Sequence, residues 1–363
     1  MSRPQQVLSA PYLDASVRKI LVCQLRQLGD VLLATPAVEL LAKRFPNAEI
    51  HFFTEQKCEP LLRGNPHITK IWELDKKLLP TLFHEIRFYR RITAEGFDLV
   101  VDFQQLPRCR WVVLFSNAPI RLSHPPRWYQ RLLYTHYVQP KGGYAAHYKI
   151  GILAPLGITG DGTEYPRLYL TEDERREAAE IVHGFMPEGT RFVSVDPSHR
   201  HITRRWPARH FAKLMDMLAE ADSSLHFVLV CGPGDERYVS DLRGLCAHTE
   251  RIHVSPVVPL RVAAAAIGMA AMHIGVCSAP RHMAVAMGTP SFTSLGSGGI
   301  GWTHPAPEHT HAFLDIHCRP CRQNTCRFGH LRCLNELLPE DLFPAALKHL
   351  QTYGKGYPRI QSS

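Results

Sequence analysis

The sequence predicts an α/β protein with two doubly wound domains. Its 363 residues suffice for two domains that each bury a hydrophobic core. A strand at 18–25, a helix at 31–45 and a strand at 46–55 form a β-α-β unit, the building block of a parallel sheet covered by helices. The same alternation returns in the second half of the chain. We expect an N-terminal domain at 17–160 and a C-terminal domain at 161–350, facing each other across a cleft.

The first domain is predicted from three strands and one helix. RKILVCQL (18–25) is typical of a buried strand, and the polar turn RQLGD follows it. VLLATPAVELLAKRF (31–45) has helical apolar spacing, with basic residues in its last turn. PNAEIHFFTE (46–55) and DLVVDFQ (98–104) are further strands. In such sheets ligands bind at the carboxyl ends of the strands, so we expect a binding site there.

The second domain follows a segment at 157–170 that contains Gly and Pro and is typical of a linker. A helix at 171–184 begins after Thr171, and Glu174 stands three residues later, which is a capping box. The remaining elements alternate: strands at 191–197, 272–277 and 289–296, a strand and loop at 226–235, and helices at 207–221, 260–270 and 279–288.

The whole basic excess lies in the first half of the chain. Lys and Arg total 42 and Asp and Glu total 33, a formal net charge of +9. Residues 1–160 contain 21 basic and 12 acidic side chains, so residues 161–363 are neutral overall. A basic surface attracts nucleic acid, an anionic membrane or an anionic substrate. The uneven distribution predicts that the two halves bind different partners.

Neither a membrane-spanning segment nor a secretory signal is predicted. The sequence has no run of about 18 apolar residues. Residues 1–16 lack the apolar stretch of a signal peptide. We therefore expect a cytoplasmic protein whose scattered cysteines are reduced.

The turn QLGD (27–30), between the first strand and the first helix, carries a carboxylate. Gly29 permits a tight turn, and Asp30 follows at the carboxyl end of the strand. Asp30 is suited to capping the helix N-terminus. On spacing alone the cap is the favoured explanation, and a carboxylate at this edge is also able to act as a general base, a role compatible with the first.

Basic residues fill the loop HRHITRRWP (199–207). Trp206 and Pro207 are placed to anchor and start the next helix. Arg204 and Arg205 then lie near a helix N-terminus, which itself favours anions. The arginine guanidinium matches the geometry of phosphate oxygens, although a solvated charge cluster gives the same pattern.

The segment GVCSAPRHMAVAMGTP (275–290) predicts a phosphate-binding loop. A buried strand ends at Cys277, and Pro280 suits the first position of the helix that follows. Backbone N–H groups at such a helix start bind anions. The histidine one turn inside is equally explained as a structural residue. The candidate phosphate-binding residues are Ser278, Ala279, Arg281 and His282.

Taken in order, four segments resemble the ADP-heptose:lipopolysaccharide heptosyltransferases, glycosyltransferase family nine. They are LRQLGDVLLATPAVELLAKRFPNAEI, DPSHRHITRRWPARHFAKL, VLVCGPGDE and GVCSAPRHMAVAMGTP. The resemblance covers residues 18–350. It implies a GT-B fold, which has two Rossmann-like domains facing across a cleft. It also implies inverting, metal-independent transfer of a heptose from ADP-heptose to the inner core of lipopolysaccharide, at the cytoplasmic face of the inner membrane.

The resemblance also implies roles for the candidate residues. Asp30 matches the proposed catalytic base, which deprotonates the acceptor hydroxyl. Arg204 stands where the family usually has a phosphate-binding Lys. Ser278, Ala279 and His282 match the diphosphate loop of the family's D-[ST]-G-x-x-H pattern.

Nucleoside-binding residues are carried over from the Gly-rich loop CGPGDE (231–236) and from a later position. Asp235 or Glu236 matches a ribose-binding acid. Val258 matches a residue that lines the adenine pocket.

The sequence departs from the family pattern in the phosphate-binding loop. Cys277 replaces the family's Asp, Ala279 its Gly, and Arg281 its usual Met or Leu. The changes remove a carboxylate and add a cation, so the loop is more positive. Two alternatives to ADP-heptose transfer therefore stay open: transfer from another sugar donor, and a non-catalytic homologue that binds a sugar nucleotide or a lipid.

Four clustered cysteines follow in the segment HCRPCRQNTCRFGHLRC (317–333). Their spacing, C-x2-C-x4-C-x6-C, is compact enough for one tetrahedral zinc, and an iron–sulfur cluster is also conceivable. Reduced thiols or a local disulfide would fit as well. We expect a structural zinc at most, since the family needs no metal for catalysis. The candidate ligands are Cys318, Cys321, Cys326 and Cys333, with His317 and His330 nearby.

Arginines and aromatic residues are interleaved in the second half of the first domain. No nucleic-acid motif accompanies them, so we expect no nucleic acid partner. They predict contact with an anionic leaflet or with an anionic, lipid-linked saccharide acceptor. We expect some of these aromatic side chains to pack in the core and some of the arginines to face solvent. The residues are Phe83, Arg87, Phe88, Tyr89, Arg90, Arg91, Arg108, Arg110, Trp111, Arg121, Arg127, Trp128, Tyr129 and Arg131.

Overall fold

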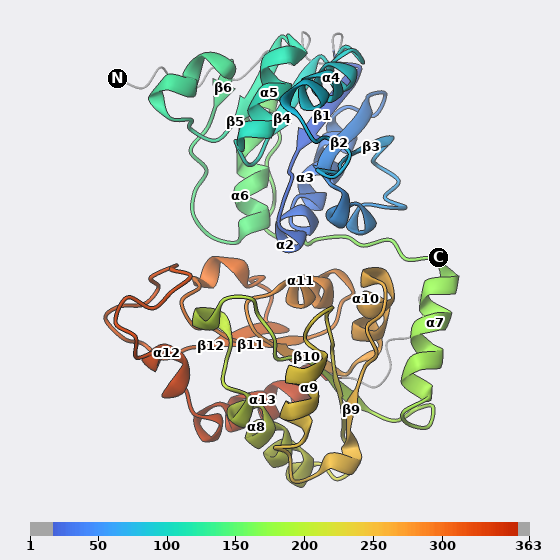
Figure 1. Ribbon diagram of the computed structural model, residues 1–363, viewed down its shortest axis with the longest axis vertical. Helices are drawn as coiled ribbons and strands as arrows, with labels where there is room; N and C mark the ends of the chain where they lie inside the picture. Colours follow the sequence, from blue (N-terminus) through green and yellow to red (C-terminus); the bar gives the residue numbers. More distant parts are fainter. Residues whose placement is uncertain (1–16, 355–363) are drawn as a thin grey trace. The chain divides into compact units, whose positions relative to one another are not determined.

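A computed structural model describes residues 17–354 and divides the chain into two compact units, Met1–Tyr169 and Leu170–Ser363. The prediction made for residues 1–16 lies outside the described residues. Each unit contains one six-stranded sheet in which all strand pairs are parallel. The predicted class, α/β with doubly wound sheets, is therefore confirmed (Figure 1).

The first sheet has the strand order β3-β2-β1-β4-β5-β6. The chain thus starts in the middle of the sheet, runs to one edge, and then returns to build the other half. This is the doubly wound arrangement with a switch point between β1 and β4. Its strands are β1 (Lys19–Cys23), β2 (Glu49–Glu55), β3 (Lys70–Leu74), β4 (Leu99–Asp102), β5 (Ile120–Ser123) and β6 (His136–Tyr137).

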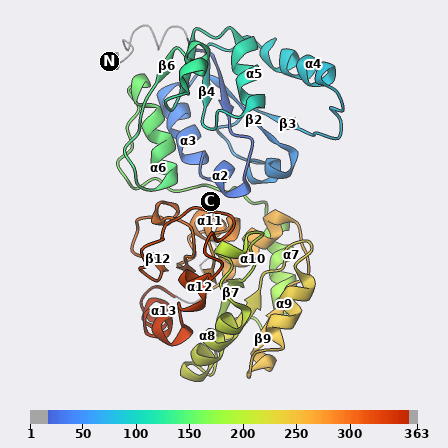
Figure 2. The ribbon, with the colours of Figure 1, turned by 60° about the vertical axis from the view of Figure 1, so that its left-hand side comes forward.

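Alternating side chains of the strands serve two helix layers. In β1, Ile20 and Val22 pack on the α3 and α6 side, whereas Leu21 and Cys23 pack on the α4 and α5 side. Figures 1 and 2 show these helices on opposite faces of the sheet. The helices are α2 (Leu28–Leu32), α3 (Thr35–Arg44), α4 (Leu82–Thr93), α5 (Pro107–Ser116) and α6 (Ala145–Ile152).

The prediction of a single helix at 31–45 is wrong, because the segment forms two helices. α2 ends at Leu32, and α3 begins at Thr35 with Pro36 in its first turn. Proline has no N–H to donate to a preceding turn, so it favours a new helix start over continuation.

The second sheet repeats the topology of the first, with the order β12-β11-β10-β7-β8-β9. Its first strand, β7, again lies beside its fourth, β10. The strands are β7 (Phe192–Asp196), β8 (His226–Leu229), β9 (Ile252–Val254), β10 (Met272–Gly275), β11 (Ser291–Ser294) and β12 (His309–Ala312).

The helices of the second unit start with α7, whose predicted capping box is confirmed. The Thr171 hydroxyl accepts from Glu174 N at 3.3 Å, and a Glu174 carboxylate oxygen accepts from Thr171 N at 2.8 Å. Glu174 also pairs with the buried Arg261 of α10, which ties the two helices together. The helices are α7 (Glu172–His183), α8 (Ala208–Ala221), α9 (Glu236–Arg243), α10 (Leu260–Met269), α11 (Ala279–Ala286), α12 (Arg332–Asn335) and α13 (Pro339–Tyr353).

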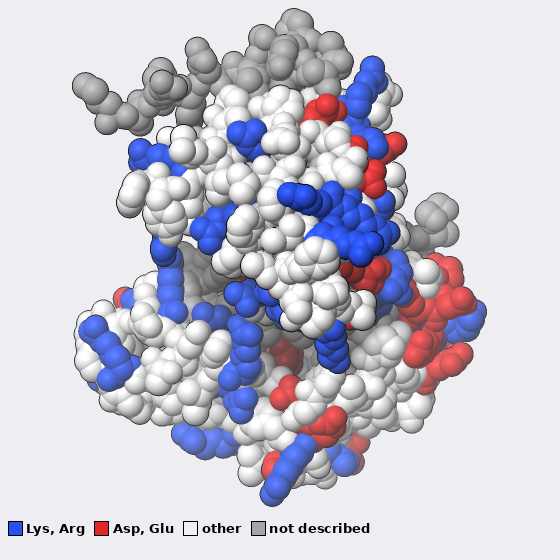
Figure 3. Space-filling model, turned by 45° about the horizontal axis from the view of Figure 1, so that its top comes forward, with Lys and Arg blue, Asp and Glu red and all other residues white. Residues whose placement is uncertain are grey.

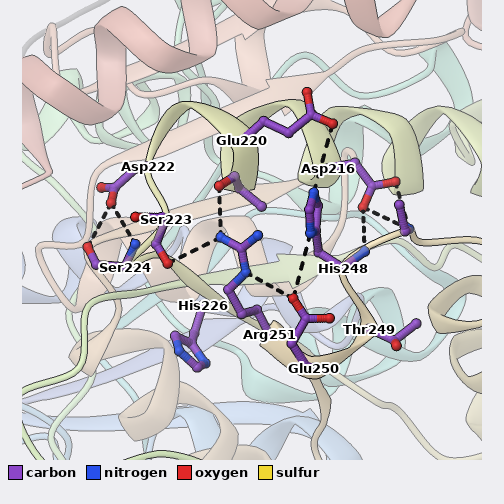
Figure 4. A network of polar contacts seen from close by, with 12 residues as sticks. Asp216, Glu220, Asp222, Ser223, Ser224, His226, His248, Thr249, Glu250 and Arg251 are labelled. Carbon is purple, nitrogen blue, oxygen red and sulfur yellow. Dashed lines mark hydrogen bonds and ion pairs between the residues drawn. The ribbon is translucent and has the colours of Figure 1, made fainter.

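A polar network at the amino-terminal edge of the second sheet fastens the end of α8 (Figure 4). Asp216 accepts from the backbone N–H groups of Ala247 and His248 at 3.0 and 3.2 Å. Arg251 donates to the Ala219 carbonyl at 2.7 Å and pairs with Glu250 at 3.3 Å. These contacts lie just before β8 and β9 begin, at the edge opposite the expected binding site, so they have a structural role.

Trp206 anchors the start of α8, as predicted. Its side chain is fully buried and its Nε1 donates to the Leu337 carbonyl at 2.9 Å, while Pro207 is the N-cap residue.

No helix within residues 17–354 is long and apolar enough to cross a bilayer.

We predict that Trp206→Ala lowers the free energy of unfolding by about 3–5 kcal/mol, because it leaves a cavity and an unpaired carbonyl. Trp128→Ala is the matched control, since Trp128 is 80% exposed; its effect should stay within about 0.5 kcal/mol. Urea-induced unfolding measures both. Equal losses in the two variants would contradict this assignment of the core.

Candidate functional site

Candidate side chains gather where the central strands of each sheet end. In a doubly wound sheet the loops after the first and fourth strands diverge, which leaves their carboxyl ends accessible. In the first unit these strands are β1 and β4, paired in register so that Cys23 lies opposite Asp102. In the second unit they are β7 and β10, with Asp196 opposite Gly275.

Asp30 lies in α2, just beyond the end of β1. It is the third residue of that helix, and Gln27 is the N-cap residue, so the alternative that Asp30 itself is the N-cap is wrong. Its carboxylate accepts from the Gln27 backbone N–H at 3.3 Å. The side chain is half-buried, so its carboxylate keeps some access to solvent.

A buried lysine that the sequence analysis missed lies in the same region. Lys149 of α6 donates to the Gln24 side-chain oxygen at 2.7 Å, and Gln24 donates onward to the Arg26 carbonyl at 2.9 Å. Burial lowers the pKa of Lys149, whereas the negative charges of Asp30 and Asp102 raise it. The turn that carries Asp30 is thus connected to a buried cation.

Asp102 lies at the carboxyl end of β4, next to the end of β1. Its carboxylate accepts from the backbone N–H groups of Gln104 and Gln105 at 2.9 and 2.8 Å, and from the Tyr134 hydroxyl at 2.7 Å. Burial raises the pKa of Asp102, and these hydrogen bonds oppose the rise. Gln104 in turn accepts from Leu25 N at 3.1 Å, which joins the loops after β1 and β4.

In the second unit, a buried carboxyl group joins two of the predicted loops. The Ser278 hydroxyl donates to Asp196 at the end of β7. Ser198 links this carboxyl group to Asp235, since its backbone N–H lies 3.4 Å from Asp196 and its hydroxyl donates to Asp235 at 2.7 Å. Burial raises the pKa of Asp196 to about 6, although the hydrogen bond from Ser278 lowers it. Asp196 and Ser198 were not singled out from the sequence.

Arg204 ends the short 3-10 helix η4 (Ile202–Arg204) in the loop after β7. Among the described residues its buried Nε has no hydrogen-bond partner. Burial and the charge of Arg204 lower the pKa of His199 to about 4, so this neighbouring histidine is neutral at pH 7. Arg205 differs, because its guanidinium donates to the His199 carbonyl at 2.6 Å and lies over the Tyr238 ring.

The phosphate-loop prediction falls at the start of α11. Ser278 is the N-cap residue and Ala279 the first residue of the helix, so their backbone N–H groups lie at a helix N-terminus. Arg281 is buried, and its guanidinium donates to the Trp302 carbonyl. His282 is also buried, and burial holds its pKa well below the usual value. Both Arg281 Nε and His282 Nδ1 lack a partner among the described residues.

The nucleoside candidates lie beyond β8 and β9. Asp235 is the N-cap residue of α9, and Glu236 begins that helix with an exposed side chain. Val258 precedes α10 and packs against Val262 and Ala265. Asp235 is thus joined to Asp196 through Ser198, whereas among the described residues no hydrogen bond joins Val258 or Glu236 to that group.

The four clustered cysteines line one cavity of about 370 Å³, together with His317 and His330. The cavity wall also includes Thr203, whose hydroxyl donates to the Gln323 carbonyl at 2.8 Å. Within residues 17–354, however, no three His, Cys, Asp or Glu side chains are arranged to bind a metal ion. The predicted structural zinc at Cys318, Cys321, Cys326 and Cys333 therefore gains no support.

Comparison with known proteins assigns the family. The model of glycosyltransferase family 9 (heptosyltransferase) matches residues 86–332. This chain belongs to glycosyltransferase family 9. It is accordingly an enzyme of the glycosyltransferase class, as predicted.

Relatives of family 9 match across both units. Lipopolysaccharide heptosyltransferase 3 of Escherichia coli is 27% identical over 281 residues, which cover 74% of this chain and 81% of that protein. A family 9 glycosyltransferase from Veillonella parvula has a similar structure, with a TM-score of 0.80 at 23% identity, covering 92% of this chain and 97% of the other. The structure of the E. coli ADP-heptose lps heptosyltransferase II has a TM-score of 0.74 at 17% identity, and the match covers 92% of this chain and 98% of the other. The likeness supports the predicted GT-B fold class.

We predict that Asp196 makes stability depend on pH. Because the folded protein raises the pKa of Asp196 from 3.8 to about 6, it binds this proton more tightly than the unfolded chain does. This contribution to the free energy of unfolding is present below pH 4 and is lost as the pH rises to about 6, with a total change of about 3 kcal/mol.

Urea unfolding between pH 4 and pH 7 tests this prediction. Asp196→Asn should remove that part of the pH dependence, and Asp241→Asn should retain it, because Asp241 is exposed on α9. Wild-type protein and Asp196→Asn with the same pH dependence would disprove the assignment.

Proposed function

We propose that this protein transfers a heptose from ADP-heptose to an inner-core acceptor of lipopolysaccharide. The observation that carries the proposal is the family 9 match over residues 86–332. The names of the relatives, lipopolysaccharide heptosyltransferase and ADP-heptose heptosyltransferase, agree on acceptor and donor. In this proposal residues 17–160 bind the acceptor and residues 161–350 bind the donor.

The donor diphosphate binds at the carboxyl edge of the second sheet. The unpaired Nε of Arg204 and the backbone N–H groups of Ser278 and Ala279 supply positive charge and hydrogen bonds. Arg281 and His282 stand behind this loop, each with one unpaired nitrogen. With this positive charge from the protein itself, the leaving diphosphate needs no metal ion.

The nucleoside extends from the diphosphate toward β8 and β9. Asp235 is placed to accept from the ribose hydroxyls, with Glu236 as the neighbouring acid. Val258 would contact the adenine ring. The bond from Ser198 to Asp235 supports this assignment, because it fixes the carboxylate beside the phosphate loop.

Transfer proceeds with inversion at the anomeric carbon. Asp30 takes the proton of the acceptor hydroxyl as that oxygen bonds to the anomeric carbon, and the bond from that carbon to the diphosphate oxygen breaks. ADP leaves with the bonding electron pair. The half-buried carboxylate of Asp30 and its place beyond the end of β1 support this role.

The enzyme works at the cytoplasmic face of the inner membrane, where its lipid-linked acceptor lies, and it binds no nucleic acid. The excess of basic residues in 1–160 supports an anionic acceptor there. Transfer from a different sugar donor is the alternative, favoured by Cys277 in the phosphate loop, where it lies 4.0 Å from the Arg281 guanidinium.

Asp30→Asn should lower kcat by about 10²- to 10⁴-fold and leave the affinity for ADP unchanged, because the carboxylate acts only in the chemical step. Asp241→Asn is the control and should keep full activity. Transfer is followed by mass spectrometry of the acceptor, and ADP affinity by calorimetry. An active Asp30→Asn variant would exclude this base. ADP binding without transfer in the wild-type protein would favour a non-catalytic homologue.

Arg204→Gln should weaken ADP binding by about 10- to 100-fold, because a charge-assisted hydrogen bond to phosphate is lost. Arg204→Lys should restore part of the affinity. Arg209→Gln is the matched control, since Arg209 is exposed on the following helix. Calorimetric titration of the three variants with ADP and with AMP measures the loss. Equal affinities for Arg204→Gln and Arg209→Gln would remove Arg204 from the site.

A further inference from the structure

We infer that the outer surface of α4, α5 and the 3-10 helix η2 (Trp128–Leu133) docks onto an anionic lipid bilayer. We call it the α4–α5–η2 surface. The inference rests on the proposed function only in that the acceptor is carried by a membrane. It adds the protein surface and the lipid chemistry that make the contact.

Large apolar side chains project from all three elements. In η2, Trp128 is 80% exposed and Leu132 is 94% exposed. Phe83 at the start of α4 is 70% exposed. Trp111 and Leu114 of α5 are also exposed. Exposing an apolar side chain to water is unfavourable. Several exposed apolar side chains on neighbouring elements therefore mark an interaction surface.

Contacts between side chains make the surface continuous. The guanidinium of Arg90 in α4 lies 5.6 Å from the ring centre of Phe115 in α5, and Trp111 stacks on that ring at 5.5 Å. η2 packs against α5. Arg127 donates to the Tyr129 hydroxyl of η2 at 3.3 Å, and this bond, together with the charges of Arg127 and of Arg110 in α5, lowers the pKa of Tyr129. The three elements therefore form one row, and α4 and α5 lie side by side in both Figures 1 and 2.

The charge of this surface is positive. Between Asp102 and Asp161, a stretch that includes α5 and η2, the sequence contains no Asp or Glu. On α4 the acid Glu85 is paired with Arg108 of α5 at 2.6 Å, so these two charges cancel each other. Exposed cations remain on the row: Arg87, Arg90, Arg91, Arg127 and Arg131. In Figure 3, where the top of Figure 1 is turned forward, basic side chains are spread over a mostly uncharged surface in the upper part of the view.

The combination of apolar tips and arginines favours a membrane over other partners. Arginines bind the anionic headgroups, while Trp128 and Leu132 enter the boundary between headgroups and acyl chains. Tryptophan and tyrosine side chains are suited to that interface because each has an apolar body and a polar group. A nucleic acid would use the arginines and the aromatic rings but gains nothing from an exposed Leu132. The matching occupant is therefore a bilayer rich in anionic lipid.

Vesicle sedimentation tests the inference with the full chain. Wild-type protein should sediment with vesicles of phosphatidylethanolamine and phosphatidylglycerol and not with vesicles of phosphatidylcholine alone. Trp128→Ser combined with Leu132→Ser, and Arg127→Gln combined with Arg131→Gln, should each weaken binding by about tenfold or more, because each arginine near the surface contributes about fivefold. Salt should reverse the binding.

Two control variants lie in the second unit. Leu245→Ser and Arg237→Gln remove an exposed apolar and an exposed basic side chain there, and should bind vesicles like the wild type. Melting temperatures within a degree or two of the wild type show that the α4–α5–η2 variants are folded.

Three outcomes overturn the inference. The first is vesicle binding that does not depend on the charge of the lipid, and the second is binding that persists in both double variants. The third is self-association of the protein that the same variants abolish, which would assign the surface to a second copy of the chain. Transfer to a water-soluble, delipidated acceptor by the wild-type protein is measured in parallel. If transfer fails while vesicles are bound, the proposed function falls and the docking surface stands.

Discussion

The pairing of the first and fourth strands in each sheet determines which residues can meet. Because the two crossovers leave this pair in opposite directions, no helix covers the carboxyl ends of its strands. Both units place a buried carboxyl group at that position: Asp102 at the end of β4 and Asp196 at the end of β7. Gly275, opposite Asp196, has no room for a side chain, since a Cβ there would lie 2.9 Å from the His273 ring.

The two carboxyl groups differ in what surrounds them. Asp102 has two backbone donors, a tyrosine hydroxyl and a lysine in its neighbourhood, so its hydrogen-bonding capacity is used within the first unit. Asp196 accepts from two serine donors and lies near a second acid, Asp235, and within residues 17–354 no cation forms an ion pair with it. Burying a carboxylate without a compensating charge is costly, and such sites are found where function requires them.

The sequence was sufficient for the fold class because hydrophobic periodicity is a local property. The central strands at 18–25, 46–55 and 98–104 were recognised from it, and so was the capping box of α7. The edge strands β3, β6, β9 and β12 were missed, because edge strands are partly exposed and their apolar pattern is weak, and β5 was missed as well. The sequence also located the loops that carry Asp30, Arg204 and Ser278, but not their partners.

Those partners are distant in the sequence. Asp196 and Ser278 are 82 residues apart, and Lys149 and Gln24 are 125 apart. Nothing in the local pattern around Lys149, inside an apolar helix, indicates that its ammonium group is buried beside Gln24. The exposed surface is a partial exception, because the sequence singled out Trp128 but not Leu132, and only the packing shows that both face outward.

The segment with the four cysteines is held by its backbone and by Arg319 rather than by its thiols. Arg319 donates to the carbonyls of Gly296 and Gly298 at 2.8 and 3.1 Å and lies 3.9 Å from the Phe313 ring centre. A Cβ on Gly296 would come within 2.3 Å of the Thr203 carbonyl oxygen, which belongs to the loop of Arg204. A side chain at position 296 would therefore displace the loop that carries Arg204 as well as the cysteine segment, because the two backbones meet at Gly296.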